Sequence, residues 1–356
     1  MPKTVTQTNR LVTLDRLRGF FIVVIIADHL SRWPSVFSLI TGKALLWVTA
    51  AEGFVAISGL LIGYVRGYKN RALPMREVSK KLLSRALLLY LWANIGSLAY
   101  TAIIWYIPLQ GGAPGIPIEK GDWLVLILQS ITLQYTYVWV HFLSLYALFL
   151  AASPLAVWLL RKNKAWLVAG ISFTLLALGW ITQSEALQWQ FIFFIPTIAG
   201  FYLESILSWW RRLTNQTRRV LTVSTIAATL TTIGLSVIAT YYSALAPAFA
   251  AAVAPLFEKD SISLLRAAMA FTWFIGFVFI FILLQRPIGK LFDWVLIPIG
   301  THSLTAYILH GVALCGISLV SVSGTNPIVN SFLGILAVLI VWSLLRIPHL
   351  NSVIPR

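Results

Sequence analysis

The sequence contains few charged residues, fewer acidic than basic ones, and almost no cysteine. Charged residues make up 11% of the 356 residues, and 11 Asp and Glu stand against 27 Lys and Arg. Because a soluble domain carries about 25% charged residues, the composition excludes a typical soluble protein. The single cysteine, Cys315, lies in an apolar run, which excludes intramolecular disulfides and zinc fingers. The chain also lacks an internal repeat, which argues against a transporter built from inverted repeats.

Long apolar runs fill most of the chain, in which 59% of the residues are hydrophobic. A helix needs about 20 mostly apolar residues to cross a bilayer. Runs of about this length lie at 17–37, 44–64, 83–107, 141–160, 165–182, 189–208, 220–242, 267–285, 299–321 and 328–346. Lys3 and Arg10 precede the first run and no A-x-A cleavage site follows it, so we expect an uncleaved anchor. The sequence predicts an all-α polytopic membrane protein with one integral-membrane domain over residues 1–356.

The distribution of basic residues predicts how these helices are oriented. The formal net charge is +16, but the basic residues cluster in short loops, as the positive-inside rule requires, so no nucleic-acid partner is expected. The side on which each loop lies depends on whether an eleventh apolar stretch, 123–139, crosses the bilayer. If it does not cross the bilayer, most of the 27 Lys and Arg lie in the cytoplasm, whereas if it crosses they divide almost evenly. We therefore expect about ten transmembrane helices, a re-entrant or surface helix at 123–139, and cytoplasmic N- and C-termini.

Ionisable residues stand where the predicted helices reach the middle of the bilayer. A charged group there costs at least about 2.5–3.5 kcal/mol, so it is expected to face a cavity, pair or do chemistry. His29 lies roughly 18 Å along the first span from Leu17, and Glu52 on the next span lies at a similar depth. We predict that His29 is a general base and that Glu52 orients it and stabilises its imidazolium. Asp28 points about 100° away from His29, so it is not expected to bond with it and its role stays open.

Three further histidines and one serine are candidates for the same site. His310 lies near the middle of the ninth span, where it or Ser58 would donate a hydrogen bond to the oxyanion. His141 opens the fourth span on the outer side, and His302 starts the ninth span near the cytoplasm. Each of these residues also has a structural interpretation, as a buried group bonded to backbone or to a neighbouring helix. No metal site is expected.

Basic residues at the cytoplasmic end of the first span suggest an anion site. Arg18 lies three turns below His29, and Arg16 and Arg85 lie at the same level. Guanidinium groups bind phosphates in a bidentate geometry, so this collar is predicted to hold an anionic ligand such as coenzyme A. The alternative is that these residues only set the topology and extend to the interface.

Several stretches together resemble a known family. RGFFIVVIIADH is similar to the first-span motif of the membrane acyltransferase-3 superfamily, and the closer match is its OpgC branch, the succinyltransferases of periplasmic glucans. The segments that carry the resemblance are DRLRG…DH, AEGFVAISG, ITLQYTYVWVHFLSLYALFLAASP and IGTHSLTAYILHG. The chain departs from the pattern at Asp28, where Asn is usual, at His141, where Asp is usual, and at Ser144, where Pro is usual. These departures bear on the acceptor and the acyl group rather than on the reaction type.

The resemblance implies acyl transfer in a bacterial cytoplasmic (inner) membrane. A cytoplasmic acyl-CoA would be a co-substrate rather than a bound cofactor, and a hydroxyl of an extracytoplasmic glycan would accept a succinyl or acetyl type of acyl group. It implies His29 as the catalytic base, supported by Arg18 and Glu52, and places Tyr146 and Ser303 in the matched motifs as binding residues. Direct transfer is favoured because no Cys lies in the motifs, while acyl-His and acyl-Ser routes stay open. A proton-coupled transporter of a small anion or glycan, and a partner-binding membrane subunit, remain alternatives.

Overall fold

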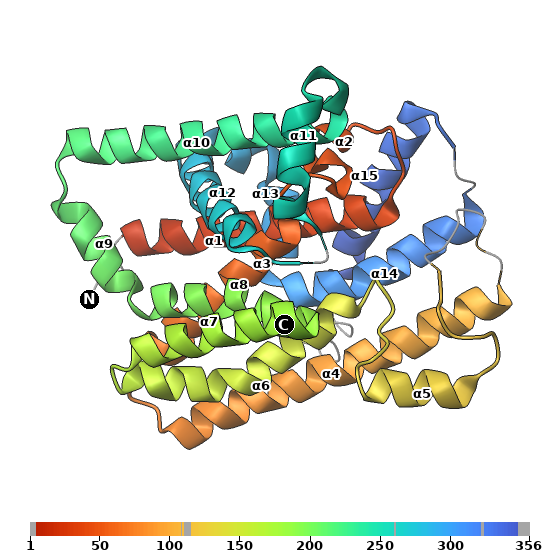
Figure 1. Ribbon diagram of the computed structural model, residues 1–356, viewed down its shortest axis with the longest axis horizontal. Coiled ribbons are helices and arrows are strands. Elements are labelled where there is room, and N and C mark those ends of the chain that lie inside the picture. The colour runs from red at the N-terminus through yellow and green to blue at the C-terminus, as the bar shows by residue number, and fades with distance from the viewer. Residues whose placement is uncertain (1–4, 108, 110–114, 260, 322–323, 348–356) are drawn as a thin grey trace.

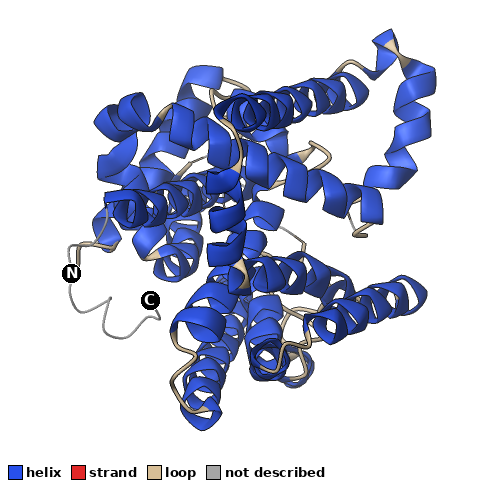
Figure 2. Cartoon of the chain, turned by 90° about the vertical axis from the view of Figure 1, so that its left-hand side faces the viewer, coloured by secondary structure: helices blue, strands red, loops and turns tan. Residues whose placement is uncertain are grey.

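The computed structural model describes residues 5–107, 109, 115–259, 261–321 and 324–347. Within these ranges every regular element is a helix and no strand occurs, as Figure 2 shows. The predicted all-α class is therefore confirmed for this part of the chain.

The longest apolar helices form the body of the protein. Seven helices in the described ranges are long and apolar enough to cross a membrane: α4 (Met75–Tyr106), α6 (His141–Arg161), α7 (Ala165–Thr182), α10 (Asn215–Tyr241), α12 (Leu264–Leu283), α14 (Ser303–Val320) and α15 (Pro327–Leu344). A further pair, α8 (Glu185–Phe201) and α9 (Leu203–Arg212), bends by 62° and gives an eighth candidate if it is one span. These helices indicate a multi-pass membrane protein. They support about seven or eight spans by length and composition, whereas the sequence suggested about ten.

The two predicted spans that carry His29 and Glu52 account for the difference. The first helix, α1 (Val5–Leu30), contains charged side chains and ends well before the predicted boundary. The second, α3 (Ala50–Leu61), begins later than predicted and continues as a π-helix, η2 (Ile62–Lys69). Thr49 and Glu52 form a capping box at the start of α3, which sets its beginning.

One long helix was not predicted from the sequence. The residues between the predicted spans 267–285 and 299–321 belong to α13 (Gln285–Thr301), which lies against α1. Because the first turns of α13 are polar, the composition of this segment does not indicate an apolar face. At the crossing, a Cβ at Gly19 would collide with the backbone oxygen of Leu296, and one at Gly300 with that of Asp15. Glycine is therefore required for the close approach of α1 and α13.

The stretch 123–139 is helical only in its first half. Its helix, α5 (Trp123–Ile131), has 9 residues and is about 14 Å long, too short to cross a bilayer. The chain then runs without regular structure along α4. Tyr135 bonds with Thr101 through their hydroxyls at 2.8 Å, and the backbone N–H of Tyr137 donates to the Ser97 hydroxyl at 3.0 Å. Irregular backbone of this kind is tolerated at membrane depth only when protein covers it.

The helices pack around α6 and α14. In Figure 1, α4, α6 and α7 lie along the lower side, α10 lies along the upper side, and α1 runs between them. In the most apolar stretch of α14, 78% of the residues are buried, whereas in that of α10 only 11% are buried. Helix α14 is therefore central and α10 is peripheral. Short helices complete the chain: α2 (Ser38–Thr41), η1 (Gly42–Ala44), η3 (Ser243–Leu245), α11 (Pro247–Val253) and η4 (Ala254–Phe257).

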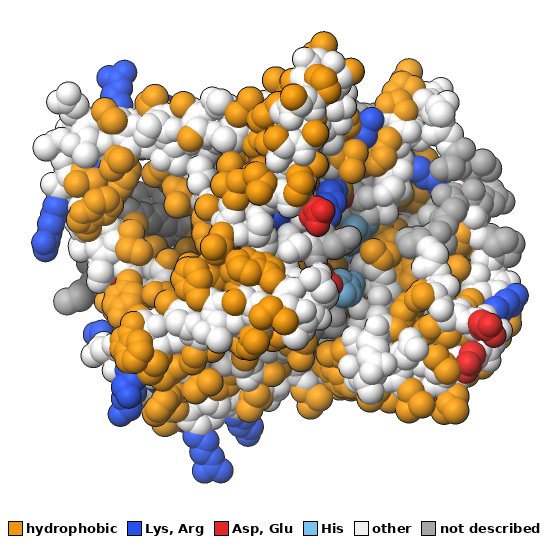
Figure 3. Space-filling model, in the orientation of Figure 1, with side chains coloured by type: hydrophobic (Ala, Val, Ile, Leu, Met, Phe, Trp, Pro, Cys, Tyr) orange, Lys and Arg blue, Asp and Glu red, His pale blue; other side chains and the backbone are white. Residues whose placement is uncertain are grey.

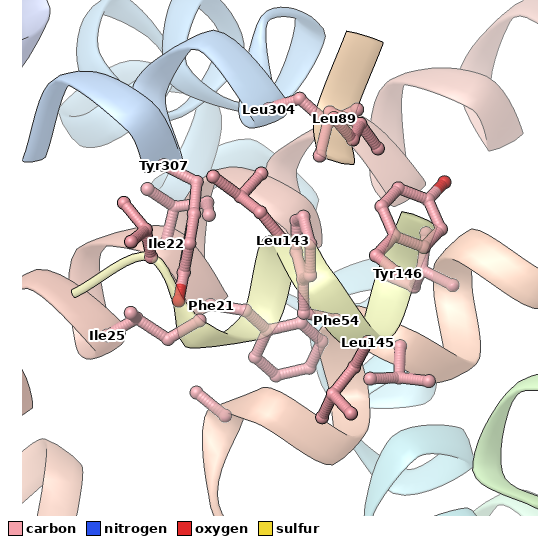
Figure 4. Packing of buried hydrophobic residues seen from close by; sticks show 14 of the residues in the cluster. Phe21, Ile22, Ile25, Phe54, Leu89, Leu143, Leu145, Tyr146, Leu304 and Tyr307 are labelled. Carbon is pink, nitrogen blue, oxygen red and sulfur yellow. The ribbon is translucent and has the colours of Figure 1, made fainter. Parts of the chain in front are cut away.

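The core joins α1, α3, α6 and α14. Figure 4 shows Phe21 and Ile22 of α1, Phe54 of α3, Leu143 of α6 and Tyr307 of α14 packed together. This contact holds the first-span candidates next to α14. In Figure 3, histidine, acidic and basic side chains meet in a hollow near the middle of a largely hydrophobic face.

Candidate active site

Two predicted histidines, His29 of α1 and His310 of α14, are in direct contact. Nδ1 of His29 lies 2.8 Å from Nε2 of His310, and His310 is fully buried. Nδ1 of His310 bonds the backbone oxygen of Tyr307, so this nitrogen carries the proton and Nε2 of His310 accepts. His29 must then donate from Nδ1, which leaves the lone pair on its Nε2. The pair therefore presents His29 Nε2 as a proton acceptor.

Tyr307 fixes the orientation of this pair and was missed from the sequence. Its ring centroid lies 4.7 Å from that of His310 and 6.4 Å from that of His29. Its hydroxyl reaches the backbone of Phe142, whose ring lies 6.0 Å away. The only sequence signal was its position three residues before His310, which places both on one helix face.

Glu52 does not orient His29, and this prediction is wrong. One carboxylate oxygen accepts from the Thr49 hydroxyl at 2.5 Å and from the Thr49 backbone N–H at 3.0 Å. The other accepts from Nε and Nη2 of Arg266, at 2.9 and 2.5 Å. Depth along a helix does not fix which way a side chain points, and Glu52 faces Arg266 of α12 rather than His29 of α1.

Arg266 is the residue that sequence reasoning missed at this point. It directly precedes the predicted span 267–285, yet it lies in α12 and is only 2% exposed. Besides Glu52, it donates from Nη1 to the backbone oxygens of Glu258, Lys259 and Ser261, at 2.8, 2.9 and 3.1 Å. Its hydrogen bonds bind α3 to the chain before α12, so the Glu52–Arg266 pair is a structural tie.

A carboxylate does pair with a histidine elsewhere, at the starts of α6 and α8. Nε2 of His141 lies 2.7 Å from Oε2 of Glu185, and Nδ1 of His141 lies 2.6 Å from the Thr136 hydroxyl. The side chains of His141 and Glu185 are 38% and 44% exposed. His141 opens α6 and Glu185 opens α8, so the pair joins two helix starts. His141 lies close enough to His29 for an electrostatic interaction between the two rings.

Asp28 faces away from the histidine pair, toward the segment after α1. Its carboxyl interacts with Thr41, with the backbone N–H of Ala44 and with Lys259, and its Oδ1 is buried without a partner in the described chain. A pocket of about 470 Å³ opens at Thr41, between α1, α3, α10 and α12. Its walls are mostly aromatic and aliphatic side chains: Phe20, Phe21, Trp273, Phe274 and Phe277 are among them. Asp28 thus belongs to the rim of this region rather than to His29.

Arg18 lies at the other end of α1 among further arginines. Its Nη2 donates to the Ser303 hydroxyl at 2.5 Å, and the Tyr146 hydroxyl and the Arg85 guanidinium are close enough to act on its charge. Arg66 of η2, which the sequence did not single out, acts in turn on Arg85. The Nε atoms of Arg18 and Arg85 are buried, and neither has a hydrogen-bond partner among the residues that the structure describes. The cluster therefore has N–H donors available to bind an anion.

Three other candidates have partners of their own. Arg16 makes a bidentate ion pair with Asp293, with both N···O distances at 2.7 Å. The Ser58 hydroxyl donates to the Phe54 carbonyl one turn back, at 2.9 Å. Nδ1 of His302 lies 3.2 Å from the Pro298 oxygen at the junction of α13 and α14. The contacts of Ser58 and His302 match their structural interpretation, whereas the ion pair of Arg16 was not predicted.

Comparison with known proteins identifies the family. A family model described as OpgC protein matches residues 10–349. The chain belongs to the OpgC protein family. The match covers Arg18 and His29 of α1, the His141 segment and His310, so the whole candidate site of this OpgC family member lies within it. Membership supports a membrane transferase at the level of reaction class, and neither a curated protein nor a solved structure matches the chain.

Proposed function

We propose that this OpgC family member is an integral-membrane O-acyltransferase. It moves an acyl group of the succinyl or acetyl type from cytoplasmic acyl-CoA to a hydroxyl of an extracytoplasmic glycan. The observation that carries this proposal is the His29–His310 contact at 2.8 Å, which leaves an imidazole lone pair available deep in a membrane protein. Family membership supports the same reaction class.

The histidine pair supplies general-base chemistry. Nε2 of His29 takes the proton of the acceptor hydroxyl as its oxygen attacks the thioester carbonyl. His310 Nε2 accepts from His29 Nδ1 throughout, so it holds the ring in place and stabilises the imidazolium that forms. The C–S bond breaks, the coenzyme A thiolate leaves, and the proton on His29 passes to it.

The arginine cluster supplies binding for the donor. Arg18, Arg85 and Arg66 concentrate positive charge with unused N–H donors, a suitable environment for the phosphates of coenzyme A. Arg18 and His29 lie on one continuous helix, roughly 16 Å apart along its axis. A donor anchored at Arg18 therefore has to extend along α1 for its thioester to reach His29.

The test is acyl transfer by the purified protein in lipid nanodiscs. Release of the coenzyme A thiol and mass spectrometry of the glycan ester are followed for wild type and His29→Ala. General-base help contributes about 10²–10⁴-fold, so His29→Ala should lose activity by that factor while its unfolding midpoint stays near wild type. Near wild-type turnover by His29→Ala would remove this histidine from the mechanism. Uptake of an anion or glycan without consumption of acyl-CoA would instead favour the transporter alternative.

A further inference from the structure

Thr136, His141 and Glu185 form a continuous chain of hydrogen-bonding groups. The Thr136 hydroxyl lies 2.6 Å from His141 Nδ1, and His141 Nε2 lies 2.7 Å from Glu185 Oε2. Thr136 stands in the irregular segment between α5 and α6, while the other two residues open α6 and α8. Thr136 and His141 are thus five residues apart, whereas Glu185 comes from a more distant part of the chain.

The order of the groups fits an activated nucleophile. A carboxylate only accepts, so Nε2–H of His141 donates to Glu185, and Nδ1 is left to accept the proton of the Thr136 hydroxyl. A hydroxyl held by an imidazole that a carboxylate in turn orients is the arrangement that turns Ser or Thr into a nucleophile. Glu185 also stabilises the imidazolium that forms when His141 takes the proton.

This chain of groups adjoins the histidine pair of the proposed reaction. His141 lies close enough to His29 for an electrostatic interaction, and Phe142, the next residue, is bonded through its backbone to the Tyr307 hydroxyl. Tyr307 in turn packs on both His29 and His310. His29 thus lies on the buried side of the Thr136–His141–Glu185 chain. On the other side, His141 and Glu185 are partly exposed to solvent.

We propose that Thr136 is a covalent carrier of the acyl group. This inference rests on the proposed function and replaces its single attack on the thioester with two successive steps. In the first step the Thr136 oxygen attacks the thioester carbonyl and gives its proton to His141. The C–S bond breaks, coenzyme A leaves as the thiolate, and the acyl group is held as a Thr136 ester. His141 remains protonated beside Glu185.

In the second step a glycan hydroxyl attacks the ester carbonyl. His29 takes the hydroxyl proton, and the bond between the acyl carbon and the Thr136 oxygen breaks. The Thr136 oxygen recovers its proton from the His141 imidazolium. His29 then releases its proton, which balances the thiolate formed in the first step, so the net products are the glycan ester and free coenzyme A.

The direct test is acylation of the protein in the absence of glycan. Wild-type protein in nanodiscs is mixed with isotopically labelled succinyl-CoA or acetyl-CoA, quenched, and analysed by intact mass and peptide mapping. Wild type and Thr136→Ser should carry one acyl ester at position 136 and release one equivalent of thiol in a burst. Thr136→Val should carry no label and transfer acyl groups to glycan at a rate lower by about 10²–10⁴-fold.

A matched control and a second variant separate chemistry from folding. Thr132→Val alters a nearby exposed threonine whose hydroxyl bonds only the backbone, and it should behave as wild type. Glu185→Gln keeps the size of the side chain and should slow the burst without removing the site of labelling. The carrier role is overturned if Thr136→Val transfers at the wild-type rate, or if productive wild type forms no ester at Thr136. If wild type neither consumes acyl-CoA nor acylates glycan, the proposed function itself fails.

Discussion

The two histidine pairs of this protein differ in partner and in exposure. His29 bonds a second imidazole, His310, which is fully buried and anchored to a backbone carbonyl. His141 bonds a carboxylate, Glu185, and both side chains are more than a third exposed. A buried carboxylate without full compensation is costly in a membrane protein. The fold therefore gives the buried base a neutral partner and places the charged partner where water can reach it.

The buried arginines show a similar contrast. Arg266 uses its Nε and both terminal nitrogens on Glu52 and on three backbone oxygens. Within the described part of the chain, Arg18 donates to the Ser303 hydroxyl, and its buried Nε has no partner. A fully satisfied arginine stabilises the fold, whereas one with donors left over is suited to bind a ligand.

The largest effect on catalysis is expected from breaking the buried pair at His310. In His310→Ala, Nδ1–H of His29 loses its acceptor, so the ring is no longer oriented. We expect kcat to fall by about 10²–10⁴-fold with little change in KM for acyl-CoA, measured by thiol release. A kcat within twofold of wild type would show that His29 works without its partner.

The next largest effect is on stability, at the Glu52–Arg266 tie. Removing one member of a buried ion pair leaves an uncompensated charge, which costs about 3–5 kcal/mol. Arg266→Met should lower the free energy of unfolding by this amount, measured by reversible denaturation in mixed micelles. The double variant with Glu52→Gln should be less destabilised than the sum of the single variants, and simple additivity would contradict the pairing.

A third effect separates the ligand-binding arginine from a surface one. Hydrogen bonds to charged groups contribute about 1.5–3 kcal/mol, so Arg18→Gln should raise KM for acyl-CoA about tenfold to hundredfold. Activity at saturating donor should change far less. Arg211→Gln, on the exposed end of α9, is the matched control and should leave KM within twofold of wild type. Equal effects of both variants would place the donor elsewhere.

The smallest effect is expected on stability at the exposed histidine pair. Ion pairs in contact with solvent contribute about 0–1 kcal/mol. Glu185→Gln should therefore change the free energy of unfolding by less than about 1 kcal/mol while it slows acyl transfer. A stability loss as large as that of Arg266→Met would mean that the pair is part of the scaffold.

The sequence predicted the helical class and several members of the site, but not how they pair. His29, His310 and Arg18 were found because polar groups in apolar runs need a reason to be there. The partner of Glu52 was missed because depth along a helix can be counted from the sequence, whereas rotation about its axis depends on packing. Arg266 lies 214 residues away from Glu52, so no local pattern links them.

Helix α13 was missed for a related reason. Its first turns, beginning at Gln285, are polar, and only the contact with α1 reveals its buried face. The ion pair between Arg16 and Asp293 joins residues 277 positions apart and removes Arg16 from the predicted anion collar. Arg66 replaces it beside Arg85, on a π-helix whose register a regular helical pattern does not predict.

The continuity of α1 between Arg18 and His29 has a consequence for the choice of donor. Both residues stand on one unbroken helix, so the distance between them along its axis is fixed. On the proposed function, every coenzyme A thioester seated at Arg18 presents its carbonyl at the same height, whatever chain it carries. Selection among acyl groups must then occur beyond His29, in the space that receives the acyl chain, rather than where coenzyme A binds.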